Sequence, residues 1–249
     1  MIAMSTIFKI LKIIIPKKFK LMIIYNYLKI FKKLDDEMFY TLKKCKTRRL
    51  AIDIGANSGL YSYFYSKHFN EIKSFEPFKS ASKNLVSSNI KNIDIHNVAL
   101  SSKTESLILH VPILKDGSII HSQASLKKEN ENSLKVNVKC KTLDSYHFND
   151  VDLIKIDVEG YEEEVLIGAI KTIKRYMPIL QIELEERHLG HTPTKLINFI
   201  ENLGYDAYVY FDKEFIKAID FPYVSNQRNC IQSNNFENYC NNFIFIPIK

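Results

Sequence analysis

The chain has 249 residues, of which 46% are hydrophobic and 12% aromatic. A chain of this length and composition can bury a sizeable core, which excludes a disordered protein. The formal net charge of +7 is concentrated at one end. Residues 1–49 hold 13 of the 35 basic and 3 of the 28 acidic residues, so the remainder is slightly acidic. Proteins that track phosphates carry basic surface near their site, so this division predicts that nucleic acid is not a partner.

The first 33 residues combine eight lysines with many apolar side chains and contain no acid. From Phe19 onward, the apolar positions 19, 22, 23, 27, 30 and 31 match one face of a helix. The longest uncharged stretch, Leu21–Leu28, is far shorter than the roughly 20 residues that cross a bilayer, and no secretory signal is evident. We expect a basic helical segment over 1–47 attached to one domain over 48–249. Two interpretations stay open: a helix packed on the domain with a solvated lysine face, or peripheral contact of residues 1–33 with anionic lipid.

A short apolar stretch, Leu50–Ile54, stops at a glycine-containing turn. The run from Asp53 through Gly55 to Gly59 predicts a buried strand that turns directly into a helix. The glycines allow the turn and let a ligand approach the unpaired N–H groups at the helix start. The Gly-x-Gly-x-x-Gly spacing that admits a pyrophosphate in dinucleotide folds is absent. An acid on the strand and no phosphate cradle favour a cationic adenosine ligand, and S-adenosylmethionine is such a ligand.

A second acidic position follows one helix later. Ile72–Pro77 predicts a strand that ends at Glu76, about 20 residues beyond the first glycine. Nucleotide-binding folds place there the carboxylate that accepts hydrogen bonds from ribose hydroxyls. Taken alone, Glu76 and Pro77 are equally typical of a strand that ends before a helix, because proline suits the first helical position. Together with the glycine turn, the position predicts that Glu76 binds ribose.

From Leu50 onward, strand and helix patterns alternate, which indicates an open α/β sheet. Strands are expected at 50–54, 72–76, 93–98, 152–157, 177–184, 205–211 and 242–248, and helices near 58–68, 79–90, 161–174 and 192–203. This count predicts a seven-stranded, mostly parallel, Rossmann-like sheet. Alternating segments at Ser106–Val111 and Leu134–Cys140 predict an inserted β-arm over the carboxyl ends of the strands, where ligands bind. The asparagine-rich stretch Ser225–Asn242 is expected to be a surface loop.

The fourth strand ends in a run of charged residues. Lys155 lies within the strand, Asp157 at its carboxyl end and Glu159 in the turn that follows. Acids favour helix starts, so Asp157 or Glu159 could cap the next helix while Lys155 pairs with one of them. The alternative is that they hold an acceptor hydroxyl and take its proton. His188, after the next strand, is a third candidate base, although a lone histidine near a helix start is more often structural.

Cysteine and histidine spacing indicates no metal site. The four cysteines form no Cys-x-x-Cys pair, so neither a zinc site nor a disulfide framework is expected. His188 and His191 could share a helix face, but no third ligand accompanies them. Unpaired cysteines favour a reducing compartment, so we expect a cytoplasmic protein, with the inner face of the membrane as the second option.

Six sequence blocks resemble, in the same order, those of FkbM-type S-adenosylmethionine-dependent methyltransferases. The blocks are Asp53–Ser62, Phe75–Pro77, Asn97–Ser101, Thr142–Asp144, Ile154–Glu162 and Leu166–Ala169. One block is weak evidence, whereas six in order identify the family. The resemblance covers about residues 48–210. The lysine-rich beginning and the stretch after 225 fall outside it, so it gives no support to membrane association.

The resemblance implies a Rossmann-like class I methyltransferase domain that binds S-adenosylmethionine. It implies a ribose contact from Glu76, an adenine contact near Ala99, and contacts around the methionine end from Asp53, Gly55, Asn57 and Gly59. Such enzymes are generally linked to O-methylation, often of sugars in surface polysaccharides or of secondary metabolites. The acceptor is then a glycan or a small molecule.

The expected reaction is an in-line attack of an acceptor oxygen on the sulfonium methyl group. A base assists because a sugar hydroxyl is a poor nucleophile until its proton leaves, and the candidates in order are Asp157, Glu159 and His188. A nicotinamide-dependent dehydrogenase is disfavoured by the missing third glycine. A non-catalytic nucleotide-binding module of a membrane-associated biosynthetic complex is disfavoured by the charged residues expected in the crevice.

Overall fold

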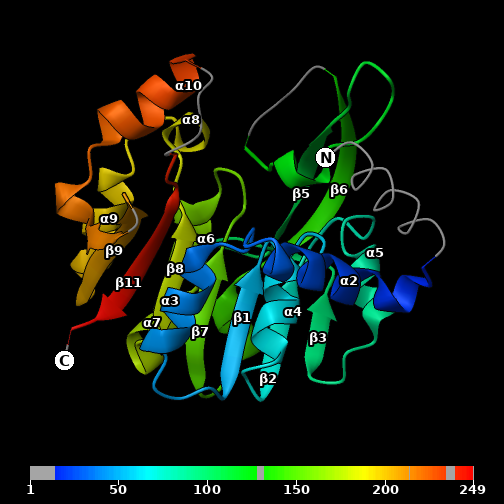
Figure 1. Cartoon of the computed structure of the whole chain (residues 1–249), viewed down its shortest axis with the longest axis horizontal. Coiled ribbons are helices and arrows are strands. Elements are labelled where there is room, and N and C mark those ends of the chain that lie inside the picture. Colours follow the sequence, from blue (N-terminus) through cyan, green and yellow to red (C-terminus); the bar gives the residue numbers. More distant parts are fainter. Residues whose placement is uncertain (1–14, 128–131, 213, 234–238, 249) are drawn as a thin grey trace.

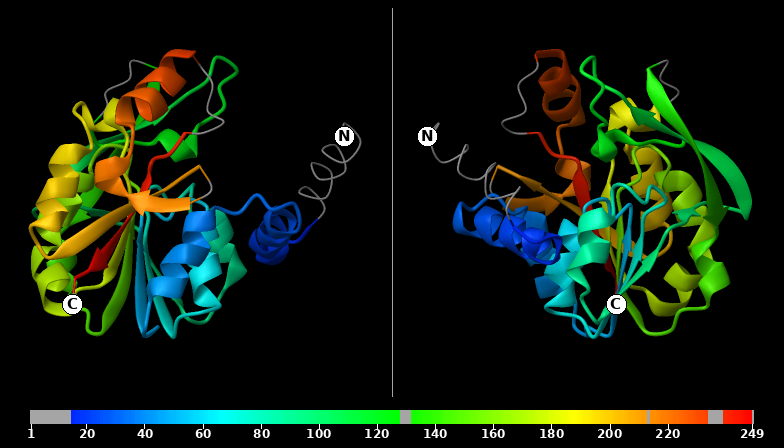
Figure 2. Two further views of the ribbon diagram at one scale, coloured as in Figure 1. Left: turned by 60° about the vertical axis from the view of Figure 1, so that its left-hand side comes forward. Right: turned by 90° about the vertical axis from the view of Figure 1, so that its right-hand side faces the viewer.

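A computed structural model of the chain describes residues 15–127, 132–212, 214–233 and 239–248. The chain forms an eight-stranded sheet between two layers of helices, with a three-stranded arm beyond the carboxyl ends of the central strands (Figures 1 and 2). In spatial order the large sheet contains β10 (Glu214–Lys217), β9 (Tyr205–Phe211), β11 (Asn242–Pro247), β8 (Ile179–Glu183), β7 (Val151–Ile156), β1 (Leu50–Ile54), β2 (Glu71–Phe75) and β3 (Ile93–His96). All neighbours from β3 to β8 pair in parallel, whereas β11 and β10 pair antiparallel with their neighbours.

The centre of the sheet contains a reversal of strand order. The chain runs from β1 outward through β2 to β3 and then returns to β7, which lies on the other side of β1. Ligands of open α/β sheets bind outside the carboxyl ends of the strands at such a reversal. The end of β1, where the predicted glycine turn begins, and the end of β7 are therefore neighbours.

Helices cover both faces of the sheet, as Figure 2 shows. One layer contains α2 (Lys17–Ile30), α3 (Asp36–Lys44), α4 (Leu60–Ser66) and α5 (Lys83–Ser88), and the other contains α6 (Glu162–Gly168), α7 (Ile170–Tyr176) and α9 (Thr194–Glu201). Side chains of β1 alternate between the layers, as the pleat of a strand requires. Ile52 and Ile54 share a core cluster with Val165 of α6, whereas Ala51 packs with Phe64 of α4.

The predicted β-arm is present. It contains β4 (Ala99–Leu100), β5 (Glu105–Pro112) and β6 (Ser133–Lys141), with β6 in the middle. Leu109 of β5 and Val138 of β6 are buried in a small core of the arm. A short 3₁₀ turn, η1 (His121–Gln123), lies between β5 and β6 along the chain. Backbone hydrogen bonds between His110 and Ser125 hold the segment after this turn against β5.

At two places the structure has one element more than the sequence predicts. The sheet has eight strands rather than seven, because β10 adds a short antiparallel edge strand beside β9. Its four residues are too few for an alternating pattern to be distinctive. The helix predicted over 161–174 is two helices, α6 and α7, that meet at Ala169. At Gly168 the chain passes so close to Ser101 that a Cβ would lie 2.0 Å from the Ser101 carbonyl oxygen.

The loop predicted over 225–242 is partly helical. A π-helical turn at Val224–Arg228 leads into α10 (Asn229–Ser233), and residues 234–238 lie outside the described residues. Polar contacts anchor this helical segment to the body. Gln227 is fully buried, and its amide donates to the carbonyl oxygens of Leu184 and Cys240 at 2.9 and 3.0 Å. Arg228 also pairs with Glu186 of α8 (Glu186–Leu189). Because these anchors are polar, hydrophobic periodicity did not reveal the helix.

The N-terminal segment forms α2 and α3 within the described residues, and its first 14 residues lie outside them. Helix α2 packs on the body through Leu21 and Tyr25, which are buried. The predicted apolar stripe is a different face, because Phe19 and Ile30 are exposed. Among the described helices, none is both long enough and apolar enough to cross a membrane.

Candidate active site

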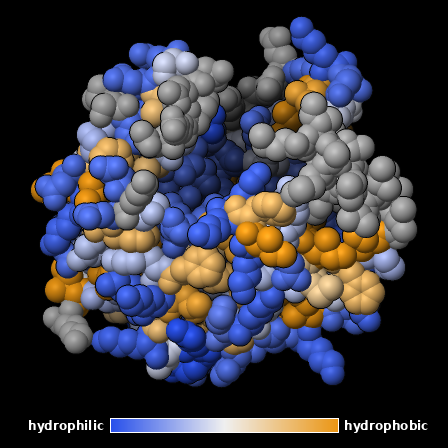
Figure 3. All heavy atoms as spheres, in the orientation of Figure 1, coloured by the Kyte–Doolittle hydropathy of each residue, from blue (hydrophilic) through white to orange (hydrophobic). Residues whose placement is uncertain are grey.

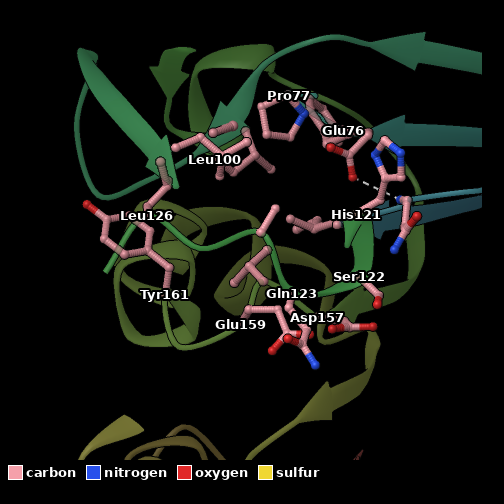
Figure 4. A pocket seen from close by; sticks show the side chains of 18 of the residues that line it. Glu76, Pro77, Leu100, His121, Ser122, Gln123, Leu126, Asp157, Glu159 and Tyr161 are labelled. Carbon is pink, nitrogen blue, oxygen red and sulfur yellow. Dashed lines mark hydrogen bonds between the residues drawn. The ribbon is translucent and has the colours of Figure 1, made fainter. Parts of the chain in front are cut away.

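A cavity of about 350 Å³ lies at the carboxyl ends of β1, β2, β7 and β8 (Figure 4). Its walls come from the turn after β1, the turn after β2, the arm, and the ends of β7 and β8. A volume of this size suits a small-molecule site. In Figure 4, Glu76 and Pro77 lie at one end, and Gln123, Asp157 and Glu159 converge at the other.

The glycine turn after β1 fits tightly against the end of β7. Gly55 has a φ of +78°, and a Cβ on it would lie 1.7 Å from the Asp157 carbonyl oxygen, so no side chain fits there. Gly55 and Asn57, which are predicted to contact the ligand, both line the cavity. Gly59 does not line it. A Cβ on Gly59 would instead meet Leu85 of α5 at 2.6 Å, so this glycine lets α4 and α5 pack closely.

Glu76 links the turn after β1 to the turn after β2, and these two turns form one end of the cavity. One carboxylate oxygen accepts the N–H of Asn57 at 2.9 Å, and the other accepts the N–H of Phe78 at 2.8 Å. Its side chain lines the cavity although the residue is only 7% exposed. Burial raises the pKa of Glu76 to about 7, against the two backbone N–H groups that favour the ionised form.

The next wall combines the start of the arm with its 3₁₀ turn. Ala99, the predicted adenine neighbour, lies in the lining with Leu100. His121 of the 3₁₀ turn also lines the cavity, and its ring stacks on Phe78 with the ring centroids 5.2 Å apart. Burial, with help from Lys83, lowers the pKa of His121. The wall is therefore mostly apolar, as a flat aromatic ligand requires.

Asp53 does not reach the cavity. It is fully buried on the α4 side of the sheet, where the Ser62 hydroxyl donates to it at 2.5 Å. Its other oxygen lies 3.9 Å from the ammonium of Lys155, its register partner on β7. Side chains alternate along a strand and Ile52 faces the α6 layer, so Asp53 points away from that layer. The sequence pattern does not show which face of the strand the α6 layer covers. Asp53 therefore lies behind the turn, outside the cavity lining.

Asp157 lies at the end of β7 and lines the cavity. Lys155 donates to one of its oxygens at 2.8 Å from a position that is only 3% exposed. Burial disfavours the charged ammonium, but the attraction of Asp157 and Asp53 outweighs it and raises the pKa of Lys155 above its ordinary value. The charged ammonium of Lys155 therefore lies next to the end of the cavity that Asp157 lines.

Glu159 and His188 form a close pair. The Nδ1 atom of His188 lies 2.8 Å from a carboxylate oxygen of Glu159. Glu159 lines the cavity and His188 does not, so the histidine contacts the carboxylate from behind. Glu159 has a φ of +56°, and Glu162 supports this turn by accepting the N–H groups of Val158 and Gly160. The hydroxyl of Ser125, on the arm, donates to the Glu159 carbonyl oxygen at 2.7 Å.

Glu183, at the end of β8, is a lining residue that sequence reasoning did not select. Burial, followed by the nearby charges of Asp157 and Glu185, raises the pKa of Glu183 to about 10. The side-chain amide of Asn241 donates to Glu183. Arg187 also lines the cavity and pairs with Glu185. The signal that could have found Glu183 is its place at the end of a buried strand beside β7, the same argument that selected Asp157.

The cavity suits S-adenosylmethionine by the chemistry of its walls. Gly55 and Asn57 present a tight turn, Glu76 presents a carboxylate that can accept further hydrogen bonds from hydroxyls, and Ala99 lies in an apolar wall. Besides Glu76, the lining contains Asp157, Glu159, Glu183 and Arg187. Burial favours the neutral form of Glu183, so Asp157 and Glu159 are the acids at this end that can offset the positive charge of a cationic ligand.

Three solved structures are similar in fold at low sequence identity. A methyltransferase FkbM from Methylobacillus flagellatus KT has a TM-score of 0.48 and 15% identity, and the match covers 80% of this chain and 43% of that structure, so this chain spans less than half of its length. An rRNA methylase from Streptococcus thermophilus has a TM-score of 0.48 and 9% identity over 86% and 95% of the two chains. The protein SMU.1697c from Streptococcus mutans, in complex with SAH, has a TM-score of 0.44 and 12% identity over 85% and 96%.

The presence of an rRNA methylase among these structures corrects one prediction. The charge division along the chain predicts that nucleic acid is not a partner, and this prediction is wrong. The physical reason is that the summed charge of a domain does not determine the local potential at one groove or loop, because charges act over about 10 Å at moderate salt.

A sequence model of the methyltransferase FkbM domain matches residues 53–207, which is more than half of the chain. The match spans the glycine turn, Glu76, and the end of β7 with Asp157. A comparison with curated protein sequences gave no significant match. With its central parallel sheet and its cavity at the strand reversal, the chain belongs to the FkbM methyltransferase family and is an S-adenosylmethionine-dependent methyltransferase.

Proposed function

We propose that the protein methylates a hydroxyl group, on a sugar of a surface glycan or on a secondary metabolite. The observation that carries this proposal is the set of carboxyl groups at one end of the cavity: Asp157, Glu159 and Glu183. Carboxyl groups accept hydrogen bonds from hydroxyls and can take a proton from one of them. They lie across the cavity from Glu76, so a cofactor and an acceptor have separate walls.

The cofactor, when bound, supplies an electrophilic methyl group. Glu76 would hold the ribose hydroxyls, Gly55 and Asn57 would border the methionine end, and Ala99 would border the adenine. An acceptor hydroxyl would lie at the end of the cavity that Asp157 and Glu159 line, where one of these carboxyl groups would take its proton. The protein contributes mainly by aligning the acceptor oxygen with the methyl group and excluding water.

Asp157 is our first candidate for the group that takes the acceptor proton. Lys155 holds one of its oxygens, which orients the carboxylate at the cavity floor. Glu159 is the second candidate, with His188 as a positioning residue that contacts it from behind. Burial raises the pKa of Glu183, which favours its protonated form, and in that form Glu183 would donate a hydrogen bond to the acceptor.

We also propose a cytoplasmic location. Cys45 and Cys140 are buried free thiols, and burial raises the pKa of both thiols. Buried free thiols are typical of proteins that fold in a reducing compartment.

The test uses S-adenosylmethionine labelled with carbon-13 in its methyl group and a panel of hexose glycosides and nucleotide sugars. We expect the label in an O–CH₃ group by NMR for at least one sugar. The Asp157→Asn variant should bind S-adenosylhomocysteine with unchanged affinity in calorimetry and turn over about 10² to 10⁴-fold more slowly. The control is Glu163→Gln, because Glu163 pairs with Lys195 outside the cavity lining.

Two results would contradict the proposal. A label on nitrogen or carbon of the product would exclude O-methylation. Unchanged turnover in Asp157→Asn would remove Asp157 as the base and leave Glu159, to be tested by Glu159→Gln.

A further inference from the structure

Helix α2 has two apolar faces, and within the described residues only one of them packs on the body. Leu21 and Tyr25 are 1% and 3% exposed, and Leu21 packs against Ala56 and Leu85. Ile30 follows Leu21 by nine positions, which is about two and a half turns of a helix at 3.6 residues a turn. It therefore points away from the body, and it is 74% exposed.

The outward face carries large apolar side chains. Phe19 (42% exposed) and Ile30 (74%) lie on it, eleven positions or about three turns apart, and Met22 (38%) and Phe31 (41%) flank it on its two sides. These four side chains form the exposed apolar patch. Figure 3 shows apolar side chains over the part of the surface where Figure 1 draws α2. Single exposed apolar residues are normal on protein surfaces, but several along one helix face mark an interaction site.

Lysines flank this patch at both ends. Residues 15–33 contain six lysines and no acid, and the stretch Leu21–Leu28 between the two lysine groups is uncharged. Lys17, Lys18 and Lys29 are exposed, as are the two lysines that follow Phe31. An apolar centre with cationic ends is the pattern of a helix that lies flat in the interface of an anionic bilayer.

We propose that α2 docks this protein on an anionic lipid surface, with the face of Phe19, Ile30 and Phe31 inserted and the lysines on the lipid phosphates. A second copy of the chain fits the face less well. A two-fold contact places the same patch on both partners, so it would set two lysine-rich helices against each other. Lipid phosphates, in contrast, neutralise all the lysines at once.

Helix α2, whose outer face docks, lies close to the cofactor end of the cavity. Leu21, on the inner face of α2, packs against Ala56, and the neighbours of Ala56 in the turn, Gly55 and Asn57, line the cavity. One turn thus touches the docking helix on one side and the cavity on the other. Docking does not depend on the acceptor that we propose, but it would bring the cavity to acceptors carried on lipid.

The test is sedimentation of the full-length protein with vesicles of phosphatidylglycerol and phosphatidylcholine, and with vesicles of phosphatidylcholine alone. We expect binding to the anionic vesicles only, and release at high salt, because salt shortens the range of the lysine–phosphate attraction. The combined variant Phe19→Ser, Ile30→Ser and Phe31→Ser should lower partitioning at least about tenfold. Each change among Lys17→Gln, Lys18→Gln and Lys29→Gln should lower it about fivefold.

Matched controls separate docking from folding and from catalysis. Ile219→Ser removes an 87% exposed apolar side chain away from α2, and Lys171→Gln removes an exposed lysine away from α2; neither should change partitioning. All variants should bind S-adenosylhomocysteine with unchanged affinity, which shows that the fold is intact. A docking failure with intact cofactor binding would therefore leave the proposed function untouched.

Three outcomes would overturn the proposal. One is no sedimentation of the full-length protein with anionic vesicles at low salt. Another is sedimentation that the apolar and lysine variants do not reduce. The third is a lipid-free dimer, seen by analytical ultracentrifugation, that the Ile30→Ser change dissolves, because this result would assign the face to a second copy.

Discussion

The two ends of the cavity are built in different ways. At the cofactor end, Gly55, Asn57 and Glu76 are held by backbone turns, and the hydrogen bond from the Asn57 N–H to Glu76 spans only 19 positions of sequence. At the acceptor end, Asp157 and Glu183 come from two strands and meet only because β7 and β8 pair. The arm adds Gln123 to that end.

This difference separates backbone geometry from side-chain electrostatics. The cofactor end depends on positive φ angles and on the absence of side chains, so a single added methyl group should damage it. The acceptor end depends on charges that compensate one another across strands, so the removal of one charge should damage it. Single substitutions at either end therefore distinguish the two kinds of dependence.

Gly55→Ala should be the most damaging change. The alanine would need a φ near +78° and would place its Cβ 1.7 Å from the Asp157 carbonyl oxygen, so the turn must move. We expect a loss of about 5 kcal/mol of unfolding free energy or an unfolded protein, and no binding of S-adenosylhomocysteine by calorimetry. Gly117→Ala is the matched control, with a φ of +81° and nothing within 4 Å of its Cβ. It should cost only about 1 kcal/mol, and an equal loss in both variants would refute the steric explanation.

Lys155→Met should be the next most damaging change. The ammonium lies 2.8 Å from Asp157 and 3.9 Å from Asp53, so its removal leaves the buried carboxylate of Asp53 and the half-buried carboxylate of Asp157 without compensation. We expect a loss of about 3 to 5 kcal/mol in urea unfolding at neutral pH. The loss should shrink as the pH falls, because protonation of the carboxylates removes the unpaired charge. Lys171→Met, on an exposed lysine, should change stability by less than about 0.5 kcal/mol. A pH-independent loss in Lys155→Met would point to packing instead.

Elements with strong local patterns could be predicted from the sequence. The strand at Leu50–Ile54, its glycine turn, the acid at Glu76 and the arm segments each depend on neighbours within a few residues. The predicted ranges of these elements agree with β1, β2, β5 and β6 to within a few residues. Local backbone chemistry is sufficient in these cases, because the conformation of a turn is set by its own residues.

Features that depend on a distant partner could not be predicted. The direction of Asp53 depends on which helix layer covers each face, and the role of Leu21 in place of Phe19 depends on where Ala56 lies. Gln227 anchors α10 through carbonyl oxygens of two other segments, which no periodicity encodes. The perturbed environment of Glu183 arises from residues on β7 and in the turn after β8. Each of these follows from tertiary packing.

Cofactor affinity should depend on pH through Glu76. Its pKa is raised to about 7 by burial, and ribose hydroxyls donate to the ionised form, so affinity should rise as the pH increases through about 7 and then level off. Calorimetry with S-adenosylhomocysteine on both sides of this pH measures the change. Glu76→Gln should weaken binding by about 1.5 to 3 kcal/mol at high pH and remove most of this pH dependence. If the variant keeps the same pH profile, another group is responsible.

The smallest predicted effect concerns the tether between the arm and the acceptor end. The Ser125 hydroxyl donates to the Glu159 carbonyl oxygen at 2.7 Å, so Ser125→Ala should loosen the arm where it meets the Glu159 turn. One such hydrogen bond contributes about 1 kcal/mol, so amide hydrogen exchange around Ser125 and Glu159 should speed up about fivefold. Ser118→Ala is the control, because the Ser118 hydroxyl donates to Asp116 within the arm. It should leave exchange near Glu159 unchanged. Binding of S-adenosylhomocysteine should not change in Ser125→Ala, because Glu76 and the glycine turn do not depend on this tether. Weaker binding would mean that the two ends of the cavity are mechanically coupled.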